Sequence, residues 1–221
     1  MQRSKIHSLL LLSLFCGLLI VGRLLKTSDF SGKFYLNPSP RWTFLFLIWN
    51  LFLAWIPFLL SLVPKKLFRQ SGGIGLMTIW FIFWLLFFPN TLYIITDFLH
   101  LRPRSPIPFW YDILILLSFS LTGLLLGLQS LQNMLDFFIN KHNSWIIRFF
   151  PYIILFLGSI GVYLGRFMRW NSWDILNNPQ LIIMDTLSVF IHPIHYFDKL
   201  SLIGCLSLFF SLIFRLLYQN D

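Results

Sequence analysis

Two arginines and an aspartate stand among tryptophans at the end of an apolar run, in the stretch YLGRFMRWNSWDIL of residues 163–176. The planar guanidinium fork of arginine suits the binding of phosphate or carboxylate groups. If the helix continues through this stretch, residues spaced by three and four share one face. That face then carries Arg166, Arg169, Trp170 and Trp173. The spacing therefore predicts a polar helix end that is able to hold an anion.

A second polar stretch, FPNTLYIITDFLHL, ends another apolar run at residues 88–101. Pro89 has no backbone N–H and breaks or kinks a helix, which frees carbonyl groups of the preceding turn. Asn90, Tyr93 and Asp97 follow at spacings of three and four and so share a helical face. We expect this face to form a polar stripe that runs inward from one end of the helix.

A third polar stretch, PFWYDILIL at residues 108–116, begins the next apolar run with Asp112 in its first turn, where the helix dipole favours a carboxylate. Carboxylates at one site can act as acid and base or hold a divalent metal with phosphate. The candidate catalytic residues are Asp97, Asp112 and Asp174. The candidate substrate-binding residues are Asn90, Tyr93, Thr96, Arg166, Arg169, Trp170, Asn171, Ser172 and Trp173.

These polar residues also have a purely structural interpretation. Arg166 and Arg169 can neutralise the aspartates and so fix three helix ends together, because structural ion pairs resemble functional ones. Trp170 and Trp173 can be anchors at the level of the lipid headgroups. The number of polar groups exceeds what anchoring requires, so we favour a binding site.

The stretch HPIHYFD suggests a metal site, since His192, His195 and Asp198 recur every three residues. Pro193 and the missing fourth ligand weaken that interpretation, and we regard these histidines as interfacial. No phosphate-binding loop, dinucleotide fingerprint or zinc-protease motif occurs in the sequence. We therefore predict no metal and no cofactor, and whether the protein is an enzyme stays open.

The composition places these stretches in a membrane protein. Of the 221 residues, 57% are hydrophobic and 11% are charged, against about 25% charged in a soluble domain. The net charge of +9 suits loops that set topology and contact anionic lipid. Nucleic acid is not expected as a partner, because no basic run with stacking aromatics lies outside the apolar runs.

Six apolar runs approach the roughly 20 residues that a membrane helix needs. They are Ser8–Leu25, Trp42–Val63, Ile74–Ile95, Trp110–Leu131, Trp145–Gly165 and Leu200–Tyr218. The segment at residues 175–198 is too polar for a span and is predicted to be interfacial or re-entrant. The fold expected is an all-α polytopic membrane protein of about six transmembrane helices, with residues 1–221 forming one domain.

Six spans put both termini on one side of the membrane, but the arginine and lysine count is nearly even between the two sides. We assign the termini to the cytoplasm because the short loop of Lys65, Lys66 and Arg69 carries a clear positive signal. The expected location is the bacterial plasma (inner) membrane.

The three polar stretches resemble a bacterial family of multi-pass membrane proteins known only as a domain of unknown function. That family shows PN-x-x-Y-x-x-TD, then P-x-W-Y-D, then GR-x-x-RWNSWD, and the likeness covers roughly residues 42–217. The resemblance supports the fold and the choice of residues, and it implies no activity.

Three functions fit these observations. The first is a membrane-embedded site that binds, and in one version processes, an anionic lipid or a lipid-linked substrate, with membrane lipids as partners. The second is a transporter or channel, for which Asn50 and Gln129 supply polar groups inside the spans, although no inverted repeat is visible. The third is a structural or assembly subunit that docks another membrane protein through the polar cluster.

Overall fold

The computed structural model describes residues 2–27, 44–63, 73–105, 107–138 and 145–218, and every regular element within these ranges is helical. The elements are α1 (Gln2–Thr27), α2 (Phe46–Ser61), α4 (Gly73–Phe87), α5 (Pro89–Tyr93), the 3-10 helix η2 (Ile94–His100), α6 (Phe109–Phe138), α7 (Trp145–Phe167), α8 (Asp174–Asn177), α9 (Pro179–Ile191) and α10 (Phe197–Tyr218). The prediction of an all-α fold is confirmed for these residues. The assignment of residues 1–221 to one domain stays a prediction.

Five segments are long and apolar enough to cross a membrane, as judged by length and composition. They are Ser4–Lys26, Gly75–His100, Phe109–Phe138, Arg148–Phe167 and Phe197–Tyr218. The run predicted at residues 42–63 forms α2, whose 16 residues rise about 24 Å, less than the roughly 30 Å of a hydrocarbon core. The six predicted runs thus become five long helices and one shorter helix, which agrees with a membrane protein.

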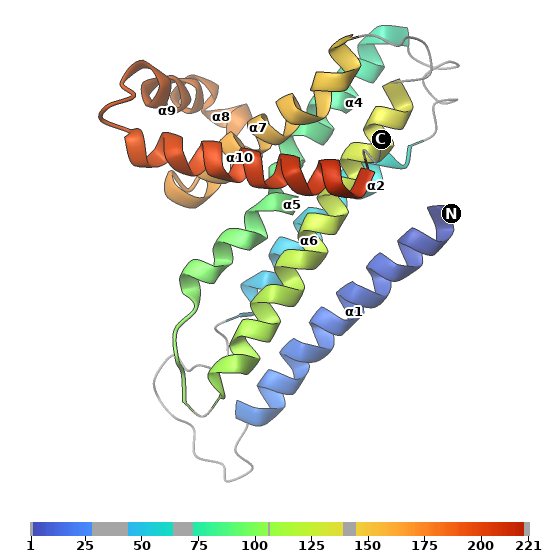
Figure 1. Cartoon of the computed structure of the whole chain (residues 1–221), viewed down its shortest axis with the longest axis vertical. Coiled ribbons are helices and arrows are strands. Elements are labelled where there is room, and N and C mark those ends of the chain that lie inside the picture. Colours follow the sequence, from blue (N-terminus) through green and yellow to red (C-terminus); the bar gives the residue numbers. More distant parts are fainter. Residues whose placement is uncertain (1, 28–43, 64–72, 106, 139–144, 219–221) are drawn as a thin grey trace.

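The segment predicted to be interfacial or re-entrant forms two short helices. α8 has four residues and α9 has 13, and among the described residues of α9 only Val189 is buried. Leu181, Met184 and Ile191 on α9 are more than half exposed. Figure 1 shows both helices at the side of the molecule, near the beginning of α10.

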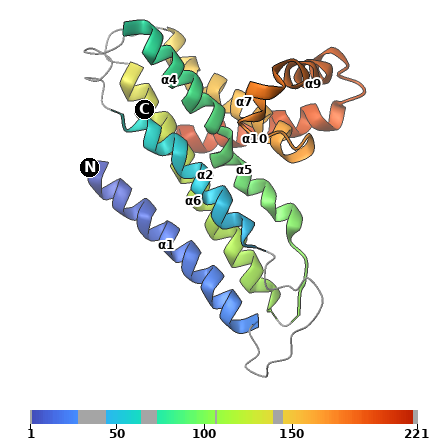
Figure 2. The same ribbon diagram turned by 180° about the vertical axis from the view of Figure 1, so that it is seen from behind.

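α1, α2 and α6 run beside one another, and α10 crosses their direction (Figures 1 and 2). The side-chain oxygen of Gln129 on α6 joins the two ends of the chain. It accepts hydrogen bonds from Lys5 Nζ on α1 and from Tyr218 Oη on α10, each at 3.0 Å. The first turns of α1 and the last turn of α10 therefore lie at the same place along α6.

The predicted break at Pro89 occurs as expected, since α4 ends at Phe87 and α5 begins at Pro89. Two side chains donate hydrogen bonds to carbonyl groups beside the break. Asn90 Nδ2 donates to the Phe87 carbonyl at 3.0 Å, and Thr91 Oγ1 donates to the Phe88 carbonyl at 2.7 Å. The backbone can therefore change direction inside an apolar segment while its polar groups keep partners.

Glycines on α6 and α7 allow both helices to approach α5 closely. A Cβ atom at Gly127 of α6 would lie 2.2 Å from Thr91 Oγ1, and one at Gly161 of α7 would lie 2.4 Å from Pro89 Cγ. Gly165, one turn beyond Gly161, faces the ring of Tyr93. The small residues at Gly161 and Gly165 of α7 therefore allow its close approach to α5.

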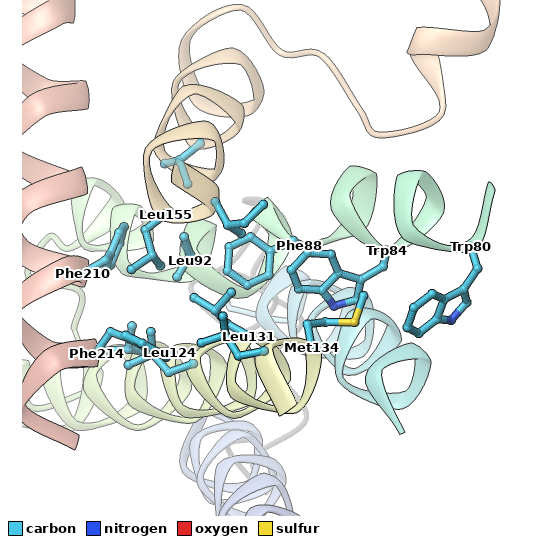
Figure 3. Packing of buried hydrophobic residues seen from close by; sticks show 14 residues of the cluster. Trp80, Trp84, Phe88, Leu92, Leu124, Leu131, Met134, Leu155, Phe210 and Phe214 are labelled. Atoms are coloured by element: carbon cyan, nitrogen blue, oxygen red, sulfur yellow. The ribbon is translucent and has the colours of Figure 1, made fainter. Parts of the chain in front are cut away.

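An apolar cluster next to α5 holds α4, α6, α7 and α10 together. Figure 3 shows Trp84, Phe88, Leu92 and Phe210 among its members. Trp84 Nε1 within it donates to Ser130 Oγ at 2.8 Å, so its indole nitrogen is satisfied. α5 and η2 are thus held against α6 and α7 by packing as well as by polar contacts.

Candidate functional site

An ion pair joins the end of α7 to η2. Arg166 Nη2 donates to Asp97 Oδ1, and the second oxygen of this carboxylate accepts a hydrogen bond from Asn50 Nδ2 at 3.0 Å. Asp97 is 0% exposed, and the Arg166 side chain is 10% exposed. Since a buried carboxylate needs compensation, Asp97 depends on both partners.

The other two nitrogens of Arg166 also have partners. Its Nε donates to Thr96 Oγ1 at 2.8 Å, and its Nη1 lies 2.9 Å from His100 Nε2. A guanidinium only donates hydrogen bonds, so the ring nitrogen of His100 is the acceptor in this contact. The guanidinium carbon also lies 4.3 Å from the centre of the Tyr93 ring. Each nitrogen of Arg166 therefore has a partner inside the protein.

The prediction that Arg169 continues the face of Arg166 is wrong. α7 ends at Phe167, and Arg169 has a left-handed backbone with φ at 60°. The Trp170 N–H then turns back to the Leu164 carbonyl at 3.1 Å, which satisfies a carbonyl at the helix end. This reversal leaves the Arg169 side chain exposed and separates it from Arg166.

The stretch from Trp170 to Asp174 forms a turn that is fastened on two sides. Asp174 Oδ2 accepts hydrogen bonds from the backbone N–H and the side-chain Nδ2 of Asn171, at 2.7 and 3.1 Å. Trp170 Nε1 donates to Asp185 Oδ2 on α9 at 2.8 Å. Asp174 was predicted to be catalytic or to pair with an arginine, and it instead shapes this turn.

The turn lies against α5. Asn90 Nδ2 donates to Ser172 Oγ at 3.0 Å, so residues 82 positions apart are in direct contact. Between the turn, α2, the end of α4, α5 and α9 lies a pocket of about 240 Å³. Its lining includes Trp49, Asn50, Leu53, Leu85, Leu86, Pro89, Asn90, Tyr93, Gly161, Leu164, Gly165, Trp170, Asn171, Ser172, Trp173, Ile175 and Ile182. We call it the α5 pocket.

Six of the candidate binding residues line the α5 pocket, and three candidate residues lie outside its lining but in the ion-pair network beside it. The six are Asn90, Tyr93, Trp170, Asn171, Ser172 and Trp173. The three are Thr96, Asp97 and Arg166. The structure therefore brings the ends of the third and fifth apolar runs together, as their polar stretches suggested.

Asp112 does not join this network. It pairs with Arg23 of α1 at 2.9 Å, and both side chains are 1% exposed. Arg104 lies 3.9 Å from its other oxygen. η2, which carries Asp97, contacts α6 at Ser120, whose Oγ donates to the Ile94 carbonyl at 3.1 Å. Ser120 is eight residues or about 12 Å along α6 from Asp112. The three candidate catalytic aspartates therefore do not share partners, since Asp97 binds Arg166, Asp112 binds Arg23 and Asp174 binds Asn171.

Sequence reasoning missed four residues that hold this arrangement. Arg23 was counted as a loop charge, although a charge inside an otherwise apolar run is itself a sign of a buried partner. Asn50 was considered only as a polar group for a transport path. His100 and Asp185 carried no spacing signal, since His100 lies after the change to the 3-10 helix η2 and Asp185 contacts Trp170 in a turn.

The proposed metal motif is dispersed in the structure. His192 and His195 are exposed, and Asp198 pairs with the neighbouring Lys199. Within the described ranges, no group of three metal-binding side chains is close enough to hold an ion.

The long apolar helices, and the helix break whose polar groups keep partners, agree with a helical membrane protein. Residues 49–214 match the family model described as protein of unknown function (DUF1361), and the chain belongs to that family. The matched range contains α5, η2, the α7 end and the turn. Comparison with curated proteins and with solved structures gives no match.

Proposed function

We propose that this protein binds the head of an amphiphilic, lipid-like molecule in the α5 pocket. The observation that supports this most directly is the composition of the pocket lining. Leu53, Leu85 and Leu86 supply apolar walls, and the amides of Asn50 and Asn90 supply polar groups at the same cavity. Apolar walls with a few placed polar groups are typical of small-molecule sites.

Exposed apolar surface beside the pocket suits a lipid tail. Trp49 is 55% exposed, and Phe52 on the same helix is 56% exposed. A ligand whose head occupies the cavity would therefore extend its chain along α2 without entering the protein core. Membrane lipids and lipid-linked molecules are the ligand classes that combine these two parts.

Binding is better supported than catalysis. None of the three aspartates considered as catalytic groups belongs to the lining residues of the α5 pocket. Asp97 belongs to the ion-pair network beside the pocket, and its two oxygens accept hydrogen bonds from Arg166 and Asn50. We therefore assign Asp97 and Arg166 to positioning the pocket, and Asp174 to shaping its turn.

Our proposal for location is a multi-pass protein of the bacterial plasma membrane with cytoplasmic termini. The meeting of Lys5 and Tyr218 at Gln129 supports a common side for the two ends. Transport and a role as an assembly subunit remain the alternatives, and the described residues offer no separate observation that favours either.

The test is recovery of a lipid with the purified protein. Leu53→Phe places a larger side chain at the pocket wall, and Leu59→Phe is the matched control on the exposed side of α2. Native mass spectrometry of the wild type and of the Leu59→Phe variant is expected to detect a bound amphiphile, and the Leu53→Phe variant is expected to lose it. Equal retention by both variants, or no bound amphiphile on the wild type, would contradict the proposal.

A further inference from the structure

The three asparagines that line the α5 pocket direct their amide nitrogens into the protein. Asn50 Nδ2 donates to Asp97, Asn90 Nδ2 donates to the Phe87 carbonyl and to Ser172, and Asn171 Nδ2 donates to Asp174. A carboxylate or a carbonyl only accepts hydrogen bonds, so these contacts fix which end of each amide is the nitrogen.

The amide oxygens of the same asparagines are left available. In the part of the chain that the structure describes, Oδ1 of Asn50, Asn90 and Asn171 has no hydrogen-bond partner. Ser172 Oγ accepts from Asn90, and this leaves its own proton free to donate. The pocket therefore offers these three acceptors beside donor groups of its lining, namely the hydroxyls of Tyr93 and Ser172 and the indole N–H groups of Trp49 and Trp173. A ligand with several hydroxyl groups, which both donate and accept hydrogen bonds, would satisfy them.

The described lining of the pocket carries no charged side chain. Arg169 precedes the lining residue Trp170, but its side chain is exposed. Arg166 follows the lining residue Gly165, and each of its three nitrogens already has a partner in Asp97, Thr96 or His100. Asp97 balances its charge. An anionic or a cationic head would lose water without gaining an opposite charge, which is unfavourable in an apolar environment. An uncharged head avoids that cost.

Aromatic rings border the same cavity, namely those of Trp49, Tyr93, Trp170 and Trp173. The Trp170 indole N–H is held by Asp185, so that side chain offers a ligand its ring surface. Aromatic faces supply large apolar contact area at fixed positions. The volume of about 240 Å³ is below the roughly 300–1,000 Å³ of common small-molecule sites, so it suits one ring-sized head.

We infer that the α5 pocket takes an uncharged polyhydroxylated headgroup, such as a single sugar ring on a lipid. Its hydroxyl groups donate to the asparagine oxygens, and its C–H face lies on the tryptophan rings. This inference rests on the proposed function and specifies the substrate class of the same site.

The experiment compares guest lipids that share a dioleoyl tail and differ in the head. The protein is placed in phosphatidylcholine nanodiscs containing glucosyl diacylglycerol, its per-O-methylated analogue, phosphatidic acid or a dioleoyl ammonium lipid. Purification uses a detergent without a sugar head. Retention of each guest lipid is read by native mass spectrometry. Two or three neutral hydrogen bonds correspond to about tenfold or more in affinity, so the glucosyl lipid is expected to exceed the others by that factor.

Variants of the pocket wall show whether the retained lipid occupies this site. Leu53→Phe is expected to abolish the preference, and Leu59→Phe is expected to keep it. Ile182→Phe on α9, with the exposed Ile183→Phe as its control, gives the same comparison if the first variant fails to fold.

Each outcome has a distinct meaning. Equal retention of the glucosyl lipid and its methylated analogue would overturn the inference, because the latter has no hydroxyl donors. Stronger retention of phosphatidic acid or of the ammonium lipid, lost in Leu53→Phe, would also overturn it and would leave the proposed function standing. Retention that does not depend on the pocket variants would contradict both proposals.

Discussion

The closeness of α7 to α5 depends on the absence of a side chain at Gly161, and the substitution Gly161→Ala tests it. The added Cβ would lie 2.4 Å from Cγ and 2.7 Å from Cβ of Pro89. Carbon atoms pack best at about 3.5–4.0 Å, so α7 and α5 must separate by about 1 Å. The proline ring is rigid and begins α5, and it cannot rotate away as a flexible side chain would.

The expected cost follows from two opposing effects. Forcing an extra methyl group into a packed contact costs about 1–3 kcal/mol. Alanine is a better helix former than glycine by about 0.8–1.0 kcal/mol, which offsets part of that cost. We expect the free energy of unfolding to fall by about 1–2 kcal/mol, because separation also disturbs the Arg166–Asp97 pair one turn further along α7.

Unfolding in mixed micelles of increasing sodium dodecyl sulfate content measures this change. Gly204→Ala on α10 is the matched control, because nothing lies within 4 Å of its Cβ position. That variant is expected to be as stable as the wild type or more stable by up to about 1 kcal/mol. If Gly161→Ala and Gly204→Ala change stability equally, the close contact with Pro89 does not exist and the reasoning is refuted.

Three further variants probe the neighbouring features. Arg169→Gly is expected to raise the free energy of unfolding by about 1 kcal/mol, since the left-handed backbone at φ 60° strains a residue with a Cβ; an unfolding curve unchanged or shifted to lower stability would count against it. Arg23→Met is expected to cost about 3–5 kcal/mol in the same assay, and adding Asp112→Leu is expected to recover part of the loss; additive losses would argue against the buried pair. Asp174→Ala is expected to speed hydrogen exchange at the Asn171 amide, and Asp174→Asn to restore much of its protection; equal exchange in both variants would show that the turn does not need the side-chain acceptor.

Features that act locally were predictable from the sequence. A proline in an apolar run stops a helix wherever the run lies, so the break at Pro89 followed from the residue type alone. Gly161 and Gly165 are two small residues four positions apart, a spacing that is itself typical of a helix face open to a neighbouring helix. The sequence did not identify α5 as that neighbour, since any of the apolar runs could have filled the gap.

Features that depend on three-dimensional register were not predictable. Arg169 was placed on the face of Arg166 because the helix was expected to continue past Phe167. The left-handed residue that ends the helix is an arginine and not a glycine, so the residue type gives no sign of the reversal. Asp112 was grouped with Asp97 because both lie near helix ends. Their partners depend on the offset between α6 and η2 along the helix axes. The spacing of residues within one helix does not determine that offset.

The central claim is that the Arg166–Asp97 pair joins η2 to the end of α7 and so holds the lining residues of α7 beside α5 at the pocket. A double-mutant cycle with Asp97→Asn and Arg166→Leu, read as free energies of unfolding in mixed micelles, measures that interaction directly. We predict a coupling energy of about 1–3 kcal/mol, with the double variant less destabilised than the sum of the single variants. A coupling below about 0.5 kcal/mol, as found for distant independent sites, would contradict the account.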